Sequence, residues 1–403
     1  MFKITPLDNG LENVQGFFCG ATNVGMRTKP INPETGHADG DVSFIRSTTP
    51  CDIAAVFTSN TFQAAPIKHF KQYPNHFQTD FVLINAKNAN AMTGEKGVED
   101  IKTIMTALSD KLNVLNPVMS STGVIGYRLP VDKIVSAFDT LAFDRANSHQ
   151  TARAIMTTDA FKKEVAYKVE LDDGTSFNIA AICKGAGMIN PAMATMLCFI
   201  ITDAAVPKED MDTLLLDATE GSFNRISVDG DTSTNDTVML LANKQSQNYY
   251  KTAFGEVLHS LMCELAMLVL KDGEGANKLV AFEVKGALSE EEAKKASMAL
   301  SNSLLVKTAL FGEDPNWGRI ASTIGASGIT CDDATLTIHY DDLLIYSNAF
   351  RELDKLREEK AYAIMKQPSF KVTCDIGLGN ESYTSYGCDL SYEYVKINAE
   401  YRT

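Results

Sequence analysis

The sequence predicts a mixed α/β protein in which short strands and helices alternate along one chain. Runs rich in β-branched and apolar residues are interleaved with runs whose apolar residues recur at helical spacing. The composition, 45% hydrophobic and 22% charged, is that of an ordinary globular protein. The chain has no internal repeat, low-complexity tract or Pro/Ser-rich linker. We therefore expect a layered sandwich instead of a string of separate small domains.

The first predicted elements are two short apolar strands, Asp52–Phe57 and Phe81–Asn85, each followed by polar turn residues. Helices are predicted next, where apolar residues recur every three or four positions. These helical segments are Val98–Leu112, Val131–Leu141 and Asp210–Phe223.

The second half of the chain begins with a long apolar helix, predicted over Thr252–Leu270 because Lys271, Asp272 and Gly273 follow it. The segment Ser289–Leu305 opens with Ser-Glu-Glu-Glu, a helix start that places acidic residues near the positive end of the dipole. After about residue 330 the pattern changes to strands, with one more helix around Phe350–Met365.

Charge and the absence of targeting segments limit the possible partners. The net charge is −14, from 37 basic and 51 acidic residues, which disfavours nucleic acid and anionic membranes as partners. The first residues form neither a signal peptide nor an Arg-rich presequence. The most apolar stretch, Met188–Ile201, is too short to span a bilayer. We expect a cytoplasmic protein.

Metal and cofactor chemistry is not indicated by the sequence. The eight cysteines are scattered, without a CxxC pair or a His partner at metal-ligand spacing, and are expected to be reduced and mostly buried. No HExxH, P-loop or GxGxxG after a strand is present. We therefore expect no metal and no cofactor.

One stretch, Lys184–Leu197, differs from ordinary core or surface sequence. Glycines, an Asn-Pro pair and small residues precede Thr195, which begins an apolar run ending at Ile201. A hydroxyl held there can attack the carbonyl before it, and the α-amino group freed by cleavage can then serve as its base. Residue types alone favour a plain strand threonine, because Ala-Thr occurs four times in the chain.

Three further stretches are rich in polar or turn-forming residues. Ser120–Gly126 can present a hydroxyl and a backbone N–H to an oxyanion, or can simply connect a strand to a turn. Phe223–Thr237 suits a solvated loop, a cation site or a buried hydrogen-bonded loop. Phe311–Ile320, which holds the only tryptophan, reads as a turn leading into a helix that starts near Asn316.

Taken together, these stretches resemble the ornithine acetyltransferase (glutamate N-acetyltransferase) family of arginine biosynthesis. The resemblance runs almost from end to end, with its motifs in the family's order. The matching motifs are Val14–Gly16, Ala55–Thr58, Ala64–Pro66, Asn88–Ala91, Ser121–Gly126, Ile155–Asp159, Lys184–Leu197, Arg225–Thr237, Asp272–Gly275, Asp314–Arg319 and Tyr394–Thr403. One departure is visible: the family's Asn-Ser-Gly-Asn-Ala-Asn-Ala-Cys-Thr-Gly is changed here at Ala86, Lys87 and Met92.

The resemblance implies a layered αββα sandwich that cleaves itself between Ala194 and Thr195. Residues 1–194 would form an α chain and residues 195–403 a β chain, both building one catalytic unit, with an α2β2 assembly. Thr195 would be the nucleophile, and Thr122 and Gly123 match the family's oxyanion-hole pair. The family's substrate contacts fall on Thr157, Lys184, Thr195, Glu274, Asn398 and Thr403.

The implied reaction moves an acetyl group from N-acetylornithine to glutamate through an acetyl-threonine intermediate. Lys184 suits a substrate carboxylate and Glu274 suits the ornithine ammonium, although without the resemblance an ordinary surface ion pair is the simpler reading of both. Some family members also accept acetyl-CoA. No CoA-binding motif is readable in this sequence, so acetyl-CoA as a second donor stays open.

Two other functions compete with this interpretation. A self-processing aminopeptidase or amidase of related fold would pass its acyl group to water instead of to glutamate. A binding protein without activity would stay a single intact chain of 403 residues and form no acyl-threonine.

Overall fold

The computed structural model describes residues 1–403 apart from residues 30, 33–35, 191–195, 351 and 401–403. The chain divides into two compact units, each assembled from separate segments. Unit 1 comprises Met1–Gly185, Ala192–Asn224 and Thr232–Val269, and unit 2 comprises Ala186–Pro191, Arg225–Asp231 and Leu270–Thr403. Both units take residues from either side of position 194. The division into units therefore does not follow the predicted cleavage point.

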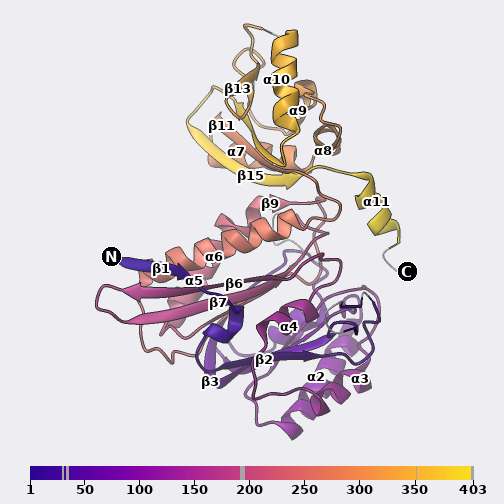
Figure 1. Cartoon of the computed structure of the whole chain (residues 1–403), viewed down its shortest axis with the longest axis vertical. Coiled ribbons are helices and arrows are strands. Elements are labelled where there is room, and N and C mark those ends of the chain that lie inside the picture. The colour runs from indigo at the N-terminus through magenta and orange to yellow at the C-terminus, as the bar shows by residue number, and fades with distance from the viewer. Residues whose placement is uncertain (30, 33–35, 191–195, 351, 401–403) are drawn as a thin grey trace. The chain divides into compact units, whose positions relative to one another are not determined.

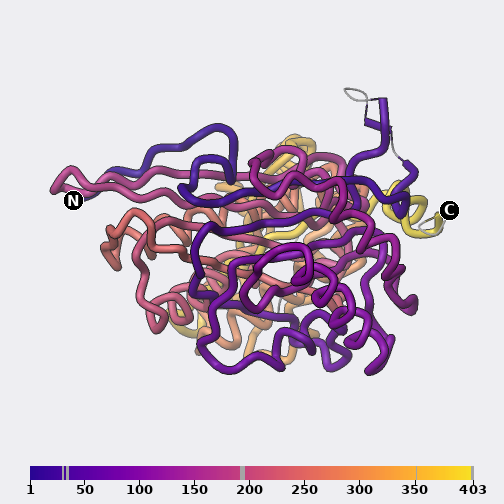
Figure 2. Tube along the Cα trace, turned by 90° about the horizontal axis from the view of Figure 1, so that it is seen from below, coloured from indigo at the N-terminus to yellow at the C-terminus, as the bar shows by residue number. Residues whose placement is uncertain are grey.

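Unit 1 is built around one sheet whose described residues form nine strands. Its strand order is β1-β6-β7-β8-β10-β3-β4-β5, with β2 also paired to β3. These strands are β1 (Phe2–Pro6), β2 (Phe17–Thr22), β3 (Val42–Phe57), β4 (Gln78–Asn85), β5 (Val118–Ser121), β6 (Lys163–Leu171), β7 (Ser176–Lys184), β8 (Leu197–Thr202) and β10 (Thr237–Ala242). Figure 2 shows β1 lying beside the long hairpin of β6 and β7 at one edge.

The long strand β3 joins the two halves of this sheet. Its first part pairs with β2 and β4, and its last part pairs with β10. The pairing with β4 shifts register between Arg46 and Cys51, a segment that contains the exposed Pro50. Proline removes a ladder hydrogen bond and is tolerated at such irregularities, where a strand bends.

The hydrophobic cores of unit 1 separate four layers. One core joins apolar side chains of β3, β4 and β5 to those of β6, β7, β8 and β10, so the two halves of the sheet face each other. A second core joins β3, β4 and β5 to α2 and α3. On the other side, Phe254 of α6 packs against Phe177 of β7 with ring centroids 5.9 Å apart. This order of layers confirms the predicted αββα sandwich, and Figure 1 shows α2 and α3 on the side of unit 1 opposite to α5 and α6.

The four helices predicted in this part of the chain are present to within a few residues, whereas the two short helices Ala65–Phe70 and Ser148–Ala154 were not predicted. The helices of unit 1 are α1 (Ala65–Phe70), α2 (Gly94–Lys111), α3 (Val131–Ser136), α4 (Ser148–Ala154), α5 (Lys208–Gly221) and α6 (Lys251–Lys271), with 3₁₀ turns η1 (Gly10–Asn13), η2 (Ala137–Asp139) and η3 (Phe223–Arg225). By length and composition alone α6 could cross a membrane. A core helix passes the same test, and 56% of the most apolar window of α6 is buried.

Unit 2 holds a six-stranded sheet in the order β13-β12-β14-β11-β15-β9, counted over the described residues. Its core joins apolar side chains of this sheet to those of α7, α8, α9 and α10. Its strands are β9 (Ile226–Ser227), β11 (Leu279–Ala287), β12 (Thr337–Tyr340), β13 (Leu343–Tyr346), β14 (Ser369–Asp375) and β15 (Glu381–Cys388). Its helices are α7 (Glu290–Asn302), α8 (Leu304–Phe311), α9 (Trp317–Ala326), α10 (Lys355–Met365) and α11 (Tyr392–Ala399).

One predicted helix of unit 2 is wrong in its extent. The pattern over Ser289–Leu305 predicted a single helix, but the structure ends α7 at Asn302 and starts α8 at Leu304. Ser303 between them has extended backbone angles, and its side chain accepts a hydrogen bond from the N–H of Val306. A serine that caps a helix in this way competes with continued helix. The predicted helix start at Asn316 is confirmed, because Asn316 caps α9.

Candidate active site

The predicted oxyanion loop is held in a conformation that requires glycine at position 123. Gly123 has a φ of +135°, and a Cβ atom there would lie 2.1 Å from the carbonyl carbon of Lys87 and 2.4 Å from the nitrogen of Asn88. The loop therefore packs directly on the segment in which this sequence departs from the family pattern. At the other two departures Ala86 is buried, whereas Met92 is 63% exposed.

Hydrogen bonds to buried polar groups fix the neighbouring residues of this loop. The N–H of Thr122 donates to the carbonyl of Asn85 over 3.0 Å, and Ser121 Oγ donates to Asn85 Oδ1 over 2.6 Å. Asn235 Nδ2 donates to the carbonyls of Ser121 at 2.8 Å and of Ala89 at 2.6 Å. Three interpretations were open for the polar stretch Phe223–Thr237. The part of it around Asn235 is a buried hydrogen-bonded loop.

Lys184, the last residue of β7, lies against the oxyanion loop. Its Nζ donates to Thr122 Oγ1 over 3.4 Å, and both side chains are buried. Because the hydroxyl oxygen accepts from an ammonium, the hydroxyl hydrogen of Thr122 is left to point to another acceptor. A threonine arranged in this way is suited to donate to a developing oxyanion.

Asp159 ties a second predicted substrate contact to the end of β7. Its Oδ1 accepts from Lys163 Nζ and from the N–H of Gly185, both at 2.7 Å, and its Oδ2 accepts from the N–H of Thr157 at 2.9 Å. Burial acts to raise the pKa of this carboxyl, but the charges of Lys163 and Lys184 and these hydrogen bonds hold it below its usual range. The carboxylate therefore positions Thr157 and the residue after Lys184.

Asp236, directly before β10, is a second fully buried carboxyl close to Lys184. Its Oδ1 accepts from the N–H of Met196 over 3.1 Å. Burial raises the pKa of Asp236 well above its usual range, although the Met196 N–H, the hydroxyls of Ser233 and Thr58 and the charge of Lys184 oppose the shift. Burial therefore favours the neutral form of this acid over the charged form.

In unit 2 the structure brings Glu274 and Asn398 together. Asn398 Nδ2 donates to Glu274 Oε2 over 2.7 Å, and the N–H of Glu274 donates to the carbonyl of Ala186 over 2.9 Å. A Cβ atom at Gly187 would lie 2.5 Å from the Glu274 carboxyl group, so glycine is needed for this approach. Glu274 is buried, whereas Asn398 lies on α11, a helix with no buried residue.

The predicted residues are thus placed in separate groups. Within unit 1, Lys184 contacts Thr122, the neighbour of Gly123. Asp159 accepts hydrogen bonds from Thr157 and from Gly185, the residue after Lys184. Within unit 2, Glu274 and Asn398 are hydrogen-bonded. The predicted cleavage pair Ala194 and Thr195 and the last residue, Thr403, lie outside the described residues.

Sequence reasoning missed the buried charges that surround the predicted residues. Asp159 belongs to the motif Ile155–Asp159 and Asp236 to the motif Arg225–Thr237, but no function was predicted for either residue. Lys163 lies outside the motifs. The available signal was weak, because acidic side chains in polar stretches are usually exposed. Only the three-dimensional contacts reveal that these three side chains are buried.

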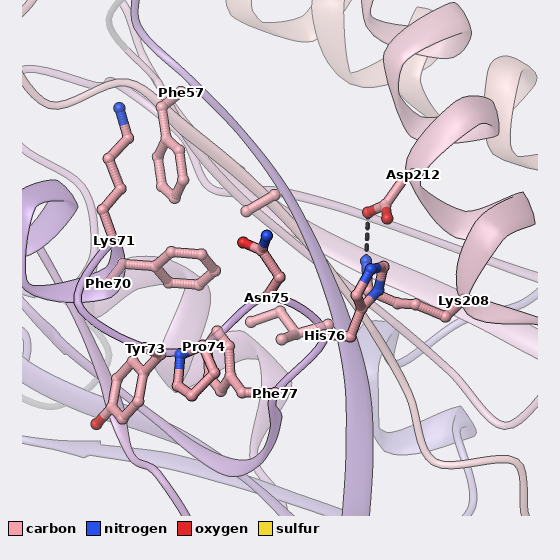
Figure 3. Close-up of a pocket in the computed structure, with 12 residues that line it drawn as sticks. Phe57, Phe70, Lys71, Tyr73, Pro74, Asn75, His76, Phe77, Lys208 and Asp212 are labelled. Carbon is pink, nitrogen blue, oxygen red and sulfur yellow. Dashed lines mark hydrogen bonds and ion pairs between the residues drawn. The ribbon is translucent and has the colours of Figure 1, made fainter.

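A separate hollow of about 380 Å³ in unit 1 contains none of the predicted site residues (Figure 3). It lies between β3, the segment around residues 70–77 and the start of α5, where Lys208 pairs with Asp212. Its aromatic lining residues are Phe57, Phe70, Tyr73 and Phe77. Among the described residues, no group of three or more His, Cys, Asp or Glu side chains is placed to hold a metal ion.

Comparison with known proteins identifies the family. The family model described as "ArgJ family" matches residues 23–403. The arginine biosynthesis bifunctional protein ArgJ of Wolinella succinogenes is 54% identical over 404 residues, which cover 100% of both chains. The glutamate N-acetyltransferase of Methanopyrus kandleri is 40% identical over 90% of this chain and 95% of its own.

A crystal structure of the arginine biosynthesis bifunctional protein ArgJ from Bacillus halodurans is 36% identical, with a TM-score of 0.47, over 50% of this chain and 97% of its own. The family model covers all but the first residues, and the relatives match over nearly their whole length. The chain therefore belongs to the ArgJ family.

Proposed function

We propose that this protein transfers the acetyl group of N-acetylornithine to glutamate, giving ornithine and N-acetylglutamate in arginine biosynthesis. The names of its relatives, arginine biosynthesis bifunctional protein and glutamate N-acetyltransferase, support an acetyltransferase of this pathway. The single observation that carries the chemistry is the buried contact between Lys184 and Thr122, next to the glycine-requiring backbone at Gly123. It supports an oxyanion site for acyl transfer.

In the proposed reaction, self-cleavage after Ala194 frees the α-amine of Thr195. Thr195 Oγ then attacks the acetyl carbonyl while this amine takes the hydroxyl proton. The Thr122 hydroxyl and the Gly123 N–H donate to the carbonyl oxygen as its negative charge develops. Ornithine leaves with the proton, and the amine of glutamate attacks acetyl-Thr195 to restore the free hydroxyl.

Both substrates are amino acids, and the proposed contacts match their charges. Lys184 would pair with a carboxylate, and Glu274, held by Asn398, would pair with the ornithine ammonium. Thr157 and Thr403 complete the proposed contacts. We also propose a cytoplasmic α2β2 enzyme made of residues 1–194 and 195–403, without cofactor or metal. The word "bifunctional" in the relatives' names supports a test of acetyl-CoA as a second donor.

The test incubates the purified enzyme with N-acetylornithine and glutamate and identifies the products. N-acetylglutamate supports the transferase, whereas free acetate alone supports the competing aminopeptidase or amidase. A parallel reaction replaces N-acetylornithine with acetyl-CoA. T195A is expected to abolish cleavage and transfer, and T195S to retain some cleavage because a hydroxyl remains. N-acetylglutamate formation by T195A would contradict Thr195 as nucleophile.

A further inference from the structure

Two cysteines lie opposite each other on the strands before and after the proposed cleavage point. Cys183 on β7 and Cys198 on β8 are direct partners in the antiparallel ladder, which ends one pair further on, at Lys184 and Leu197. Both cysteines are free thiols, and both are 0% exposed. The proposed acetyl transfer uses neither of them.

A neighbouring hydrogen bond shows which kind of ladder position the two cysteines occupy. The N–H of Asp203 donates to the carbonyl of Asn178 over 3.3 Å, so these two residues are a hydrogen-bonded pair. Hydrogen-bonded and non-hydrogen-bonded pairs alternate along an antiparallel ladder, and the register between β7 and β8 has no shift. Cys183 lies five positions beyond Asn178 (183 − 178 = 5), so Cys183 and Cys198 form a non-hydrogen-bonded pair.

This ladder position suits a disulfide. In a non-hydrogen-bonded pair the opposite Cα atoms lie about 4.5 Å apart. Disulfides join residues whose Cα atoms are about 4.4–6.8 Å apart. Burial raises the pKa of the Cys198 thiol, and a hydrogen bond with Cys183 and the charge of Cys183 raise it further. The two side chains therefore point toward each other, and a bond between their sulfur atoms does not require the strands to move.

The two thiols lie on the face of the sheet that is turned away from the Lys184 side chain. Successive side chains of a strand point to opposite faces, so Cys183 points away from the face of Ile182 and Lys184. Ile182 and Leu197 belong to the core between the two halves of the sheet, whereas Cys183 and Cys198 do not. A disulfide can therefore form without disturbing the contact between Lys184 and the oxyanion loop.

We propose that Cys183 and Cys198 form a reversible cross-strand disulfide, which joins residues 1–194 to residues 195–403. The oxidant is a peroxide. One thiol is oxidised to a sulfenic acid as the O–O bond breaks and water leaves. The other sulfur then attacks the sulfenic sulfur, so that the S–S bond forms and a second water leaves. The joining of two chains rests on the proposed function, because it assumes cleavage after Ala194, whereas the disulfide itself does not.

The disulfide would replace a covalent connection that self-cleavage removes. In the intact chain β7 continues into β8 through the segment that contains the cleavage point, and after cleavage only non-covalent contacts hold the two strands together. Oxidation should be slow, because the thiolate is the reactive form and burial disfavours it. The nearby ladder end, at Lys184 and Leu197, gives the oxidant access, since such ends open more readily than the middle of a sheet. A reducing compartment keeps both residues as thiols.

The test treats the purified wild type with hydrogen peroxide for several hours and then blocks the remaining thiols with N-ethylmaleimide. The mass of the chains is measured under denaturing conditions, with and without a thiol reductant. Without reductant the two fragments should stay joined as one species of 403 residues, and with reductant they should separate. A peptide map made without reductant should show the peptides of Cys183 and Cys198 joined. This map needs only the wild type, so it decides the question even if a variant fails to fold.

The variants C183A and C198A each remove one sulfur and should abolish the link between the fragments. The matched control is C331S, which removes an exposed cysteine of the second fragment and should leave the link intact. The oxidised wild type should also have a Tm about 5 °C or more above that of its reduced form, because a disulfide restricts the unfolded state. C183A should show no such rise.

The assignment would be overturned by fragments that separate without reductant, by a link that persists in C183A, or by a peptide map that joins other cysteines. An unchanged Tm in the linked protein would contradict the stabilising effect. If the wild type stays one chain, the cleavage proposal fails by itself, and the peptide map still decides whether the disulfide forms.

Discussion

Asp159 and Asp236 are both fully buried carboxyls under the influence of the Lys184 charge, yet their pKa values are shifted in opposite directions. Asp159 has an ammonium and two backbone N–H groups as partners, so its charged form is stabilised. Asp236 accepts one backbone N–H and is influenced by the hydroxyls of Ser233 and Thr58, but no ammonium donates a hydrogen bond to it among the described residues, so the effect of burial prevails. Burial alone therefore does not decide the state of a carboxyl; its partners do.

The two carboxyls have different surroundings near the same lysine. The Asp159 carboxylate accepts hydrogen bonds from the N–H groups of Thr157 and Gly185 and from the Lys163 ammonium. Asp236, whose pKa is raised by burial, accepts the N–H of Met196. The comparison predicts that D159N loses more stability than D236N.

The largest expected effect is on the stability of D159N. This change leaves the buried Lys163 without its carboxylate, and breaking a buried ion pair costs about 3–5 kcal/mol. D236N, in contrast, should stay within about 1 kcal/mol of its parent, because it removes an acid that burial already disfavours as a charge. Denaturant unfolding in the uncleaved T195A background measures both.

The control for D159N is the double variant D159L/K163M, which removes both charges. Replacing a buried pair by apolar residues avoids an isolated charge, so this variant should regain part of the lost stability. A D159N chain as stable as its parent would show that the pair is not structural, and the contrast with Asp236 would fail.

The next effect concerns the group on the other side of Lys184. T122V keeps the side-chain shape but removes a hydroxyl donor, so kcat should fall about 10²–10³-fold. KM should change little, because the donor is needed mainly in the transition state. The matched control is T103V, which alters an exposed threonine of α2. An unchanged kcat in T122V would remove Thr122 from the oxyanion site.

A smaller effect is expected in unit 2, where the polar contact concerns substrate binding. N398A removes the donor that holds Glu274 Oε2, so KM for N-acetylornithine should rise about 10-fold while kcat and self-cleavage are retained. K396A, on the same exposed helix, is the control and should behave like the wild type. A fall in kcat without a change in KM would assign Asn398 to the chemical step.

The smallest effect is the pH dependence of stability, which has opposite signs for the two carboxyls. The raised pKa of Asp236 gives stability that is complete below about pH 3.9, the unfolded value, and is lost as pH rises through the folded pKa. The lowered pKa of Asp159 gives stability that is present above about pH 3.9 and lost as pH falls below it. D236N should flatten the alkaline side of a Tm-versus-pH curve, and D159N the acidic side. If D236N and D159N had the same Tm-versus-pH curve, the pKa values of Asp236 and Asp159 would not be shifted in opposite directions.

The sequence predicted those features that depend on local pattern. The apolar spacing over Thr252–Leu270 gave α6, and Asn316 marked the start of α9. The break between α7 and α8 was missed because a serine does not interrupt the apolar spacing of a helix. Only the structure shows that the Ser303 side chain caps the next helix. The apolar run that ends at Ile201 corresponds to β8, whose residues are all buried.

The candidate site was predicted from the family's motifs, whereas the contacts that surround its residues were not predicted. Asn235 and Ser121 meet across 114 residues, and Asp236 meets Met196 across 40. Such pairs leave no spacing signal in a single sequence, because they depend on how β3 carries the chain from one half of the sheet to the other. Their burial also reverses the usual expectation that aspartate lies on the surface.

The measurement that tests the central claim most directly is the intact mass of the purified wild type under denaturing conditions, before and after brief exposure to N-acetylornithine. Two fragments, residues 1–194 and 195–403, are predicted, and only the second should gain the mass of one acetyl group. Subsequent glutamate should remove that group as N-acetylglutamate. A single chain of 403 residues, a cut elsewhere, or an acetyl group on the first fragment would contradict Thr195 as a self-generated nucleophile.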